Sequence, residues 1–298
     1  MKRRTFIQTS GAAALSLSLT KPLWAVQVHK HYMDSIGLQV WTVRNQLEKD
    51  APGTIKAIAD AGYKQIELGG DKNAEYIKLA KDNGMKATSA FIDWTILGKR
   101  KESDLAKFDK VVEQASANGL KHLVFGYIGK GFRETADDYK HHAENANKAG
   151  EKCKAAGIQL CYHNHSFEFG PLKDSNGKAG FDILVDQFDP KLCKFEVDVF
   201  WVAIGGRDPI KTMRSLKGRV SQVHLKDLLK GAKTQYDEGK VPHEAFEELG
   251  DGTIDMLTVL KVAKEIGVEQ CHVEQDQSPD PIKSIGQSMK HLHAINKS

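Results

Sequence analysis

Histidine and acidic side chains stand at the ends of several short apolar runs in this sequence. A charged or imidazole group inside an ordinary core strand is costly unless it is paired, so these ends are where chemistry is expected. Oxygen and imidazole ligands on neighbouring strands are what a mixed site for Mn, Mg, Co or Zn needs. One such residue is more often structural, but four neighbouring runs together favour a site. The run ends read YHNHSFE at 162–168, EVD at 196–198, HLKD at 224–227 and HVEQD at 272–276, and Glu67 closes an earlier run.

The apolar runs that carry these residues alternate with amphipathic segments. The roughly 270 residues after the first 25 suit one (β/α)8 barrel, whose typical size is about 250 residues, better than two smaller domains. We therefore expect an α/β fold, a (β/α)8 TIM barrel over residues 33–298. Helices are expected at 54–61, 74–82, 105–118, 137–156, 209–216, 256–266 and 282–292, with a short one after Phe181. Strands are expected at 36–43, 65–68, 86–92, 122–127, 158–162, 194–200, 220–225 and 270–273.

Several of the expected helices end in a glycine directly before the next strand. Glycine supplies the left-handed residue that stops a helix at its C-terminal end. A sandwich or a helix bundle has no reason to repeat this placement, so it indicates a repeated strand–helix unit. The glycines concerned are Gly62, Gly84, Gly119, Gly157 and Gly267.

The segment 229–255, after the seventh expected strand, is longer than a connection needs and predicts an active-site loop. Aromatic residues also stand beside the strand ends, at Trp41, Trp201 and Phe125. Two interpretations apply to them. They either close the core at the barrel mouth or form a wall against the apolar face of a sugar.

The N-terminus has the layout of a twin-arginine export signal. Lys2, Arg3 and Arg4 precede an apolar stretch at 12–19, which is too short to cross a bilayer. We expect a signal peptide at 1–25, passage through the twin-arginine translocase and a periplasmic protein without stable membrane insertion.

The charge balance argues against a nucleic-acid partner. Residues 1–25 carry four basic residues and no acid, so the net charge of +4 falls to zero without them. A neutral chain lacks the basic surface that phosphate backbones require. The four cysteines form no C-x-x-C pair, and we interpret them mainly as structural thiols.

Five motifs make the chain resemble the sugar phosphate isomerase/epimerase group with a xylose isomerase-like barrel. They are IGLQVW at 36–41, HNHSFE at 163–168, Val197-Asp198 with Trp201, VHLKD at 223–227 and Val273-Glu274. The resemblance covers nearly everything after residue 35, and the group includes inosose dehydratases and keto-sugar epimerases. It implies one divalent metal held by Glu, Asp, His and Glu from successive strands. Carried over residue by residue, these ligands are Glu168, Asp198, His224 and Glu274.

The first of these ligands departs from the pattern of the resemblance. Epimerases of this type place a glutamate inside the fifth strand, where this chain has His163 or His165. Glu168 has the opposite parity to both histidines, so it points inward only if the strand has ended or bulged. Either histidine is an alternative ligand. The similar keto-sugar lyases imply a His-x-x-Glu pair in which Glu168 binds the metal and His165 carries the proton.

The chemistry expected of such a site is proton transfer on a keto-sugar. The metal, which could be Mn, Co, Mg, Fe or Zn, would stabilise the enediolate formed when the carbon next to a carbonyl loses its proton. His165 is the expected base, and Glu274 or Glu168 the second acid/base group. Lys226 would hold an oxyanion or a hydroxyl. Further substrate contacts are expected from Glu67, His163, Trp41 and Trp201.

Three reactions share this first step: epimerisation, isomerisation and the loss of a β-substituent by a lyase or dehydratase. Export favours a free or glycosidic keto-sugar over a phosphorylated one, and no glycine-rich phosphate loop of Walker or Rossmann type is present in the sequence. An endonuclease IV-like enzyme of the same fold is disfavoured by the neutral charge. The alternative from another class is a non-catalytic sugar-binding barrel.

Overall fold

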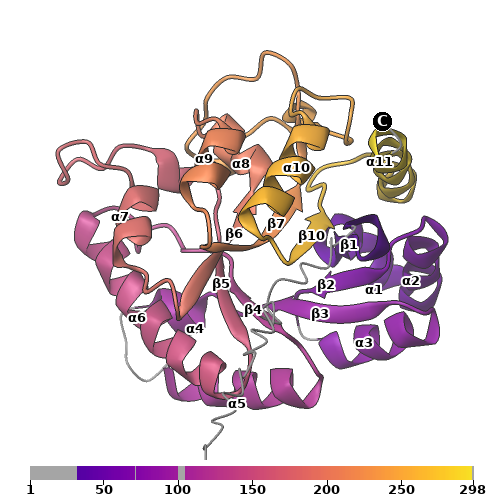
Figure 1. The fold of residues 1–298 in the computed structure, drawn as a ribbon, viewed down its shortest axis with the longest axis horizontal. Coiled ribbons are helices and arrows are strands. Elements are labelled where there is room, and N and C mark those ends of the chain that lie inside the picture. Colours follow the sequence, from indigo (N-terminus) through magenta and orange to yellow (C-terminus); the bar gives the residue numbers. More distant parts are fainter. Residues whose placement is uncertain (1–31, 71, 100–104, 297–298) are drawn as a thin grey trace, which may run out of the picture. The chain divides into compact units, whose positions relative to one another are not determined.

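Eight parallel strands close into a barrel in the computed structural model, which describes residues 32–70, 72–99 and 105–296 (Figure 1). The closed order is β1-β10-β7-β6-β5-β4-β3-β2, so the predicted (β/α)8 barrel is confirmed. The expected signal peptide lies outside the described residues. The strands are β1 (Gly37–Gln39), β2 (Gln65–Leu68), β3 (Lys86–Phe91), β4 (His122–Phe125), β5 (Gln159–His163), β6 (Cys193–Asp198), β7 (Val220–Leu225) and β10 (Gln270–Val273).

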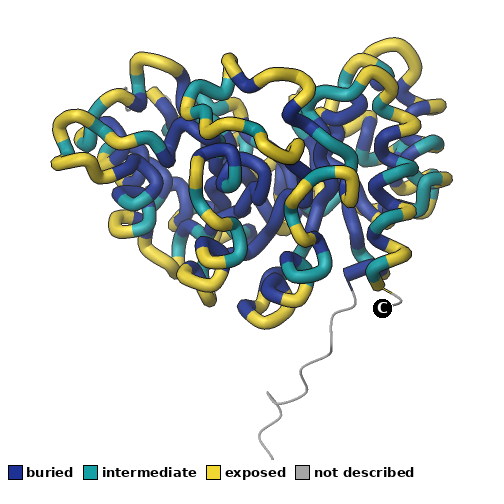
Figure 2. Tube along the Cα trace, turned by 90° about the horizontal axis from the view of Figure 1, so that it is seen from above, coloured by how far each residue is buried: buried dark blue, intermediate teal, exposed yellow. Residues whose placement is uncertain are grey.

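Helices surround the barrel (Figure 1), and in Figure 2 much of the chain at the centre is buried, in dark blue, while exposed residues lie mainly toward the outside. The expected glycines do stop helices, because Gly62, Gly84, Gly119, Gly157 and Gly267 all have positive φ angles. The helices are α1 (Arg44–Lys49), α2 (Ala51–Asp60), α3 (Asn73–Asp82), α4 (Thr95–Gly98), α5 (Leu105–Ala117), α6 (Ala136–Ala155), α7 (Gly180–Gln187), α8 (Val199–Ile204), α9 (Pro209–Ser215), α10 (Met256–Ile266) and α11 (Pro281–Ile295).

Four barrel strands, β1, β3, β4 and β6, end earlier than the apolar runs suggest, and a capping side chain explains this at β1 and β6. Gln39 ends β1, and its side chain accepts a hydrogen bond from the Trp41 amide, which starts the 3-10 turn η3 (Val40–Val43). Asp198 ends β6 and accepts from the Trp201 amide, which starts α8. A capping side chain satisfies an amide that the first helical turn leaves free. Strand ends with functional side chains therefore lead directly into short helices at the barrel mouth.

The segment 229–255, expected to be irregular, contains ordered structure. Before it, β8 (Asp227–Leu228) pairs antiparallel with β9 (Phe246–Glu247), and between them lie η6 (Glu238–Lys240) and η7 (His243–Ala245). The Asp227 carboxylate accepts hydrogen bonds from the amides of Gly250, Gly252 and Ile254. Phe246 stacks on Phe200 at 4.3 Å between ring centroids. These contacts fix the segment over the β6–β7 side of the mouth.

Two further properties concern the helices and the cysteines. Within the described part of the chain, no helix combines the length and the hydrophobicity needed to cross a membrane. The four cysteines are buried free thiols.

Candidate metal centre and active site

Four potential metal ligands converge at the C-terminal ends of adjacent strands. His163 ends β5, Asp198 ends β6, His224 lies on β7, and Glu274 follows β10. Each offers a ligand atom, and these atoms all lie within 4.8 Å of one another. We call these four residues the rim group. In this fold the C-terminal ends of the strands carry the active site.

The distances within the rim group leave room for a cation. The Nδ1 atom of His224 lies 3.0 Å from Glu274 Oε2 and 3.8 Å from Asp198 Oδ2, while His163 Nε2 lies 3.5 Å from the same Asp198 oxygen. Among the described residues, neither ring nitrogen of His163 forms a hydrogen bond, and Asp198 Oδ2 forms ion pairs but no hydrogen bond. All four side chains are buried. Buried polar atoms without hydrogen bonds call for an explanation, and a divalent cation held by two imidazoles and two carboxylates fits them.

Lys226 is the buried positive charge beside the rim group. Its Nζ lies 3.0 Å from Asp198 Oδ2, 2.6 Å from Glu274 Oε2 and 2.7 Å from Asp276 Oδ2. Burial opposes its charge, but these three carboxylates outweigh that effect and raise the pKa of Lys226 well above its usual value. Three carboxylates around one ammonium leave two negative charges when all are ionised. One divalent cation would balance them.

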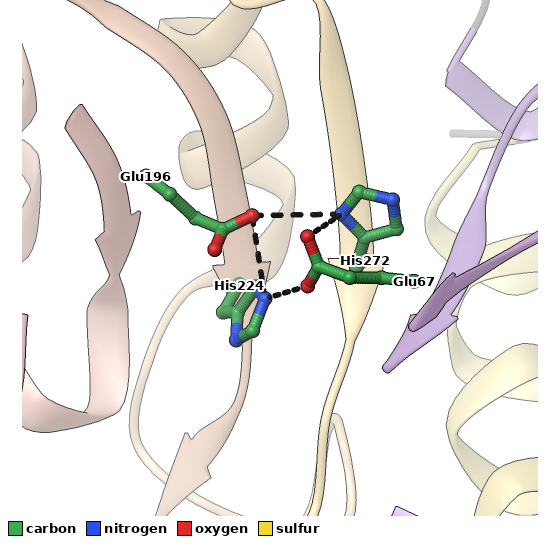
Figure 3. Close-up of side chains that lie close together, drawn as sticks. All are labelled: Glu67, Glu196, His224 and His272. Carbon is green, nitrogen blue, oxygen red and sulfur yellow. Dashed lines mark hydrogen bonds and ion pairs between the residues drawn. The ribbon is translucent and has the colours of Figure 1, made fainter. Parts of the chain in front are cut away.

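A second group of ionisable side chains lies one layer deeper in the barrel. Figure 3 shows Glu67 from β2, Glu196 from β6, His224 from β7 and His272 from β10 pointing toward one another. We call these the inner group; it shares His224 with the rim group. The Nε2 atom of His224 lies 2.6 Å from Glu67 Oε2 and 3.4 Å from Glu196 Oε1. His272 Nδ1 lies 3.9 and 3.8 Å from oxygens of the same two carboxylates.

Hydrogen bonds hold Glu67 firmly against His224. Gln39 Nε2 donates to Glu67 Oε2 at 3.0 Å, and the Ser89 hydroxyl donates to Oε1 at 2.5 Å. The contact from His224 Nε2 to Glu67 is shorter than that from Nδ1 to Glu274, which favours a proton on Nε2. Burial opposes a second proton on His224, but Glu196, Glu67 and Glu274 outweigh burial and raise the pKa of His224 well above its usual value. A cation bound at Nδ1 would replace the proton that this nitrogen shares with Glu274 and leave the proton on Nε2. This is the arrangement in which a carboxylate fixes the tautomer and orientation of a metal-binding histidine.

The electrostatics of the inner group agree with an ionised Glu67. Burial opposes its charge, but His272 and His224 outweigh burial and keep the pKa of Glu67 well below its usual range. The pKa of Glu196 is instead raised well above its usual value, first by burial and then by Glu67. Burial also lowers the pKa of His272 to about 4. Two like charges so close together favour protonation of one of them.

Glu168, expected as the first ligand, does not belong to either group. It is fully buried in the 3-10 turn η5 (Phe167–Phe169), where Oε1 accepts hydrogen bonds from the Tyr162 hydroxyl at 2.7 Å and from the His165 amide at 3.1 Å. Oε2 accepts from the same amide at 2.9 Å. Burial raises the pKa of Glu168 to about 8. The turn after β5 thus directs this carboxylate back onto the strand, and His163 takes the β5 position in the rim group.

His165 stands beside the rim group on the outer side of His163. The two imidazole centroids are 5.0 Å apart, and the His165 ring stacks on Phe167 and lies 5.2 Å from Trp201. The side chain is partly exposed, whereas the rim ligands are buried. Burial, followed by the charges of His163 and Lys226, lowers the pKa of His165 well below its usual value. A neutral imidazole at neutral pH is competent to accept a proton.

The three aromatic residues noted in the sequence occupy different environments. Phe125 is buried and packs edge-on against Tyr162, as a core residue does. Trp201 is buried against Phe200 and Phe246, and its ring also lies 5.3 Å from Lys226 Nζ. Trp41 is 53% exposed, at the mouth beside β1.

Sequence reasoning singled out Glu67 but missed the rest of the inner group. Glu196 and His272 lie two residues before Asp198 and Glu274, so they share the inward face of the same strands. The period of two could have identified them. Asp276, which holds Lys226, was also missed because it follows the strand rather than lying on it.

Comparisons with known proteins agree with this architecture. Residues 55–295 match the model of the family described as xylose isomerase-like TIM barrel. An inosose dehydratase of Clostridium tetani is 29% identical over 267 residues, covering 80% of this chain and 88% of that protein. An inosose dehydratase of Clostridium perfringens (strain 13 / Type A) is 28% identical over 248 residues, covering 76% and 82%.

Two solved structures illustrate the similarity in three dimensions. A sugar phosphate isomerase/epimerase from Parabacteroides distasonis has a TM-score of 0.72 at 26% identity, covering 91% of this chain and 96% of that one. The IolI protein, solved with a zinc atom bound, has a TM-score of 0.65 at 15% identity, covering 88% and 97%. At that lower identity the likeness concerns the fold alone.

Proposed function

The chain belongs to the xylose isomerase-like TIM barrel family, and we propose that it is a divalent-metal-dependent enzyme that removes a proton next to the carbonyl of a free or glycosidic keto-sugar. One observation carries the proposal: four potential ligands converge beside a partly exposed histidine, and two of them, His163 and Asp198, have buried atoms without hydrogen bonds. Metal ligands and an unprotonated base are the two components that this reaction requires.

His163, Asp198, His224 and Glu274 would hold the metal, with His163 in place of the expected Glu168. The bound zinc of the IolI protein supports a metal in this fold, while the identity of the metal in this chain stays open among Mn, Co, Mg, Fe and Zn. When bound, the cation would act as a Lewis acid toward a substrate carbonyl and hydroxyl. Glu67 would keep the His224 lone pair directed at it.

His165 would take the proton from the substrate carbon. Its stack on Phe167 and its contact with Trp201 hold the ring in one orientation beside His163. Lys226, fixed by Asp276, would place positive charge near the oxygen that becomes negative as the C–H bond breaks. Glu274 would serve as the second acid/base group. In this arrangement the negative charge would be stabilised at the oxygen where it develops.

Elimination is the outcome that the curated relatives favour, because both are named inosose dehydratases. In that reaction the C–H electron pair becomes a C=C bond conjugated to the carbonyl, the β-carbon–oxygen bond breaks, and the departing oxygen takes up a proton. The sugar phosphate isomerase/epimerase from Parabacteroides distasonis supports a second candidate, reprotonation of the same intermediate. Location in the periplasm after twin-arginine export completes the proposal and rests on residues 2–19.

Solvent deuterium exchange tests this function. Metal-loaded enzyme in deuterated water should introduce deuterium next to the carbonyl of at least one keto-sugar, or release its β-substituent. His165→Ala should keep its metal and lose the exchange by about 10²- to 10⁴-fold, the usual contribution of a positioned base. Exchange at the wild-type rate in His165→Ala would remove His165 from the role of base. No exchange with any keto-sugar from metal-loaded protein would favour a sugar-binding barrel instead.

A further inference from the structure

Trp41 is the most exposed large hydrophobic side chain among the described residues, at 53%. Its position is nonetheless fixed. The Arg44 guanidinium lies 4.4 Å from the centroid of its ring, and Arg44 Nη1 donates to the Trp41 carbonyl at 2.8 Å. An exposed indole held by its neighbours has already lost the conformational freedom that binding would otherwise cost.

Trp41 borders a hollow of about 290 Å³ at the mouth of the barrel. The hollow lies where β1 and β2 end, because its lining includes Val40 just after β1 and the pair Gly69-Gly70 just after β2. A side chain at Gly70 would point into open space, and its φ of +99° is one that glycine tolerates. The hollow therefore opens on the same face as the rim group.

The lining of the hollow suits a ring that carries several hydroxyl groups. It combines the indole of Trp41 with side chains that donate or accept hydrogen bonds: Gln39, Arg44, Glu48 and Lys72. Small-molecule sites typically pair an aromatic or apolar surface with a few polar groups that fix orientation. The charges are of both signs, so the lining does not select an anion such as a phosphate.

Two hydrogen-bonded connections lead from the hollow to the active site. Gln39 accepts from the Trp41 amide and donates to Glu67, which holds His224. Arg44 Nη2 donates to the Asp276 carbonyl at 3.1 Å, and the Asp276 carboxylate holds Lys226. The hollow is thus continuous with the elements that position the rim group.

We propose that this hollow is a subsite for a second sugar ring, so that the substrate class is a keto-glycoside of at least two rings. The oxidised ring would lie at the rim group and the distal ring against Trp41. The inference rests on the proposed function for the identity of the oxidised ring. Binding energy from a remote ring can then serve the reaction at the first one.

The test compares two substrates that share the oxidised ring. One is the 3-keto form of a glucose disaccharide, and the other is methyl 3-keto-glucoside, which lacks the second ring. Trp41→Ala should lower kcat/KM for the disaccharide about tenfold and change that for the methyl glycoside by less than about twofold, because only the disaccharide reaches the indole. Trp41→Phe, the matched control, should restore most of the loss.

Calorimetric binding of the same two compounds separates this inference from the proposed function. A disaccharide affinity that falls in Trp41→Ala, with the affinity for the methyl glycoside unchanged, would support the subsite even if the wild-type enzyme turned over neither compound. Equal losses for both compounds, or no loss for either, would overturn it. Unfolding temperatures of the variants should match the wild type, because the indole is largely exposed.

Discussion

The rim group and the inner group lie one layer apart in the same barrel and share His224, but their buried charges are balanced differently. In the rim group the carboxylates of Asp198 and Glu274 face the ammonium of Lys226 and the imidazoles of His163 and His224. In the inner group, neutral side chains donate hydrogen bonds to the carboxylates as well: Gln39 and Ser89 donate to Glu67, and Gln222 donates to Glu196 at 2.9 Å. Residue types alone do not distinguish the two groups.

This difference teaches how to separate a ligand from a positioning residue. Glu67 already has a partner for each oxygen, so a cation there would have to displace hydrogen bonds. In the rim group, the ring nitrogens of His163 and the Oδ2 atom of Asp198 have no hydrogen bond to lose, and a cation would have to displace only the proton that His224 Nδ1 shares with Glu274. We therefore propose that the rim group binds the metal and that Glu67 of the inner group orients His224.

The largest expected effect comes from a matched pair on β6. Asp198→Asn should reduce bound metal from about one equivalent to well below half, because it removes an anionic ligand from a buried site. Glu196→Gln, two residues earlier on the same face, should keep its metal. Elemental analysis after dialysis measures both. Equal metal loss in the two variants would erase the distinction between the groups.

A smaller effect is expected at Glu67, which acts through His224. Glu67→Gln should weaken metal affinity about 10- to 100-fold, the usual consequence of losing the carboxylate behind a metal-binding histidine. Ser89→Ala is the control, because it removes one hydrogen bond to Glu67 and leaves the contact with His224. Competition with a chelator gives the affinities. A Glu67→Gln protein with wild-type affinity would show that His224 needs no such support.

The strands of the barrel were largely predictable because each is a short apolar run with a clear boundary. The expected ranges at β2, β7 and β10 coincide with the structure. The errors at β1 and β6 arose because apolar residues continue past the strand, as Val40–Val43 and Val199–Ile204 do in the helices that follow. Hydrophobicity does not reveal the capping by Gln39 and Asp198, which depends on where the backbone turns.

The rim group was predictable in part. Asp198, His224 and Glu274 lie on strand ends, where alternation fixes the direction of a side chain. Glu168 lies beyond the end of β5, where alternation no longer applies and the η5 turn decides its direction. Its hydrogen-bond partners, the Tyr162 hydroxyl and the His165 amide, are near in sequence, but alternation does not reveal the backbone turn that brings the carboxylate to them.

The smallest expected effect concerns Glu168. Substituting this residue should change the pH dependence of stability and leave the bound metal unchanged. Because its folded pKa of about 8 lies above the ordinary value, the fold favours the protonated carboxyl. That contribution is complete below about pH 4.5 and is lost as the pH rises through about 8, at up to roughly 1.4 kcal/mol per pKa unit. Glu168→Gln cannot ionise, and its oxygen can still accept from Tyr162 and the His165 amide, as Oε1 does now. Its NH2 group replaces the acceptor Oε2 beside the same amide, which costs stability equally at both pH values. Urea unfolding at pH 5 and pH 8.5 should therefore show a larger loss of stability in the wild type than in the variant, while bound metal stays the same in both. Parallel pH profiles would contradict the raised pKa, and loss of metal from Glu168→Gln would return this residue to the ligand set in place of His163.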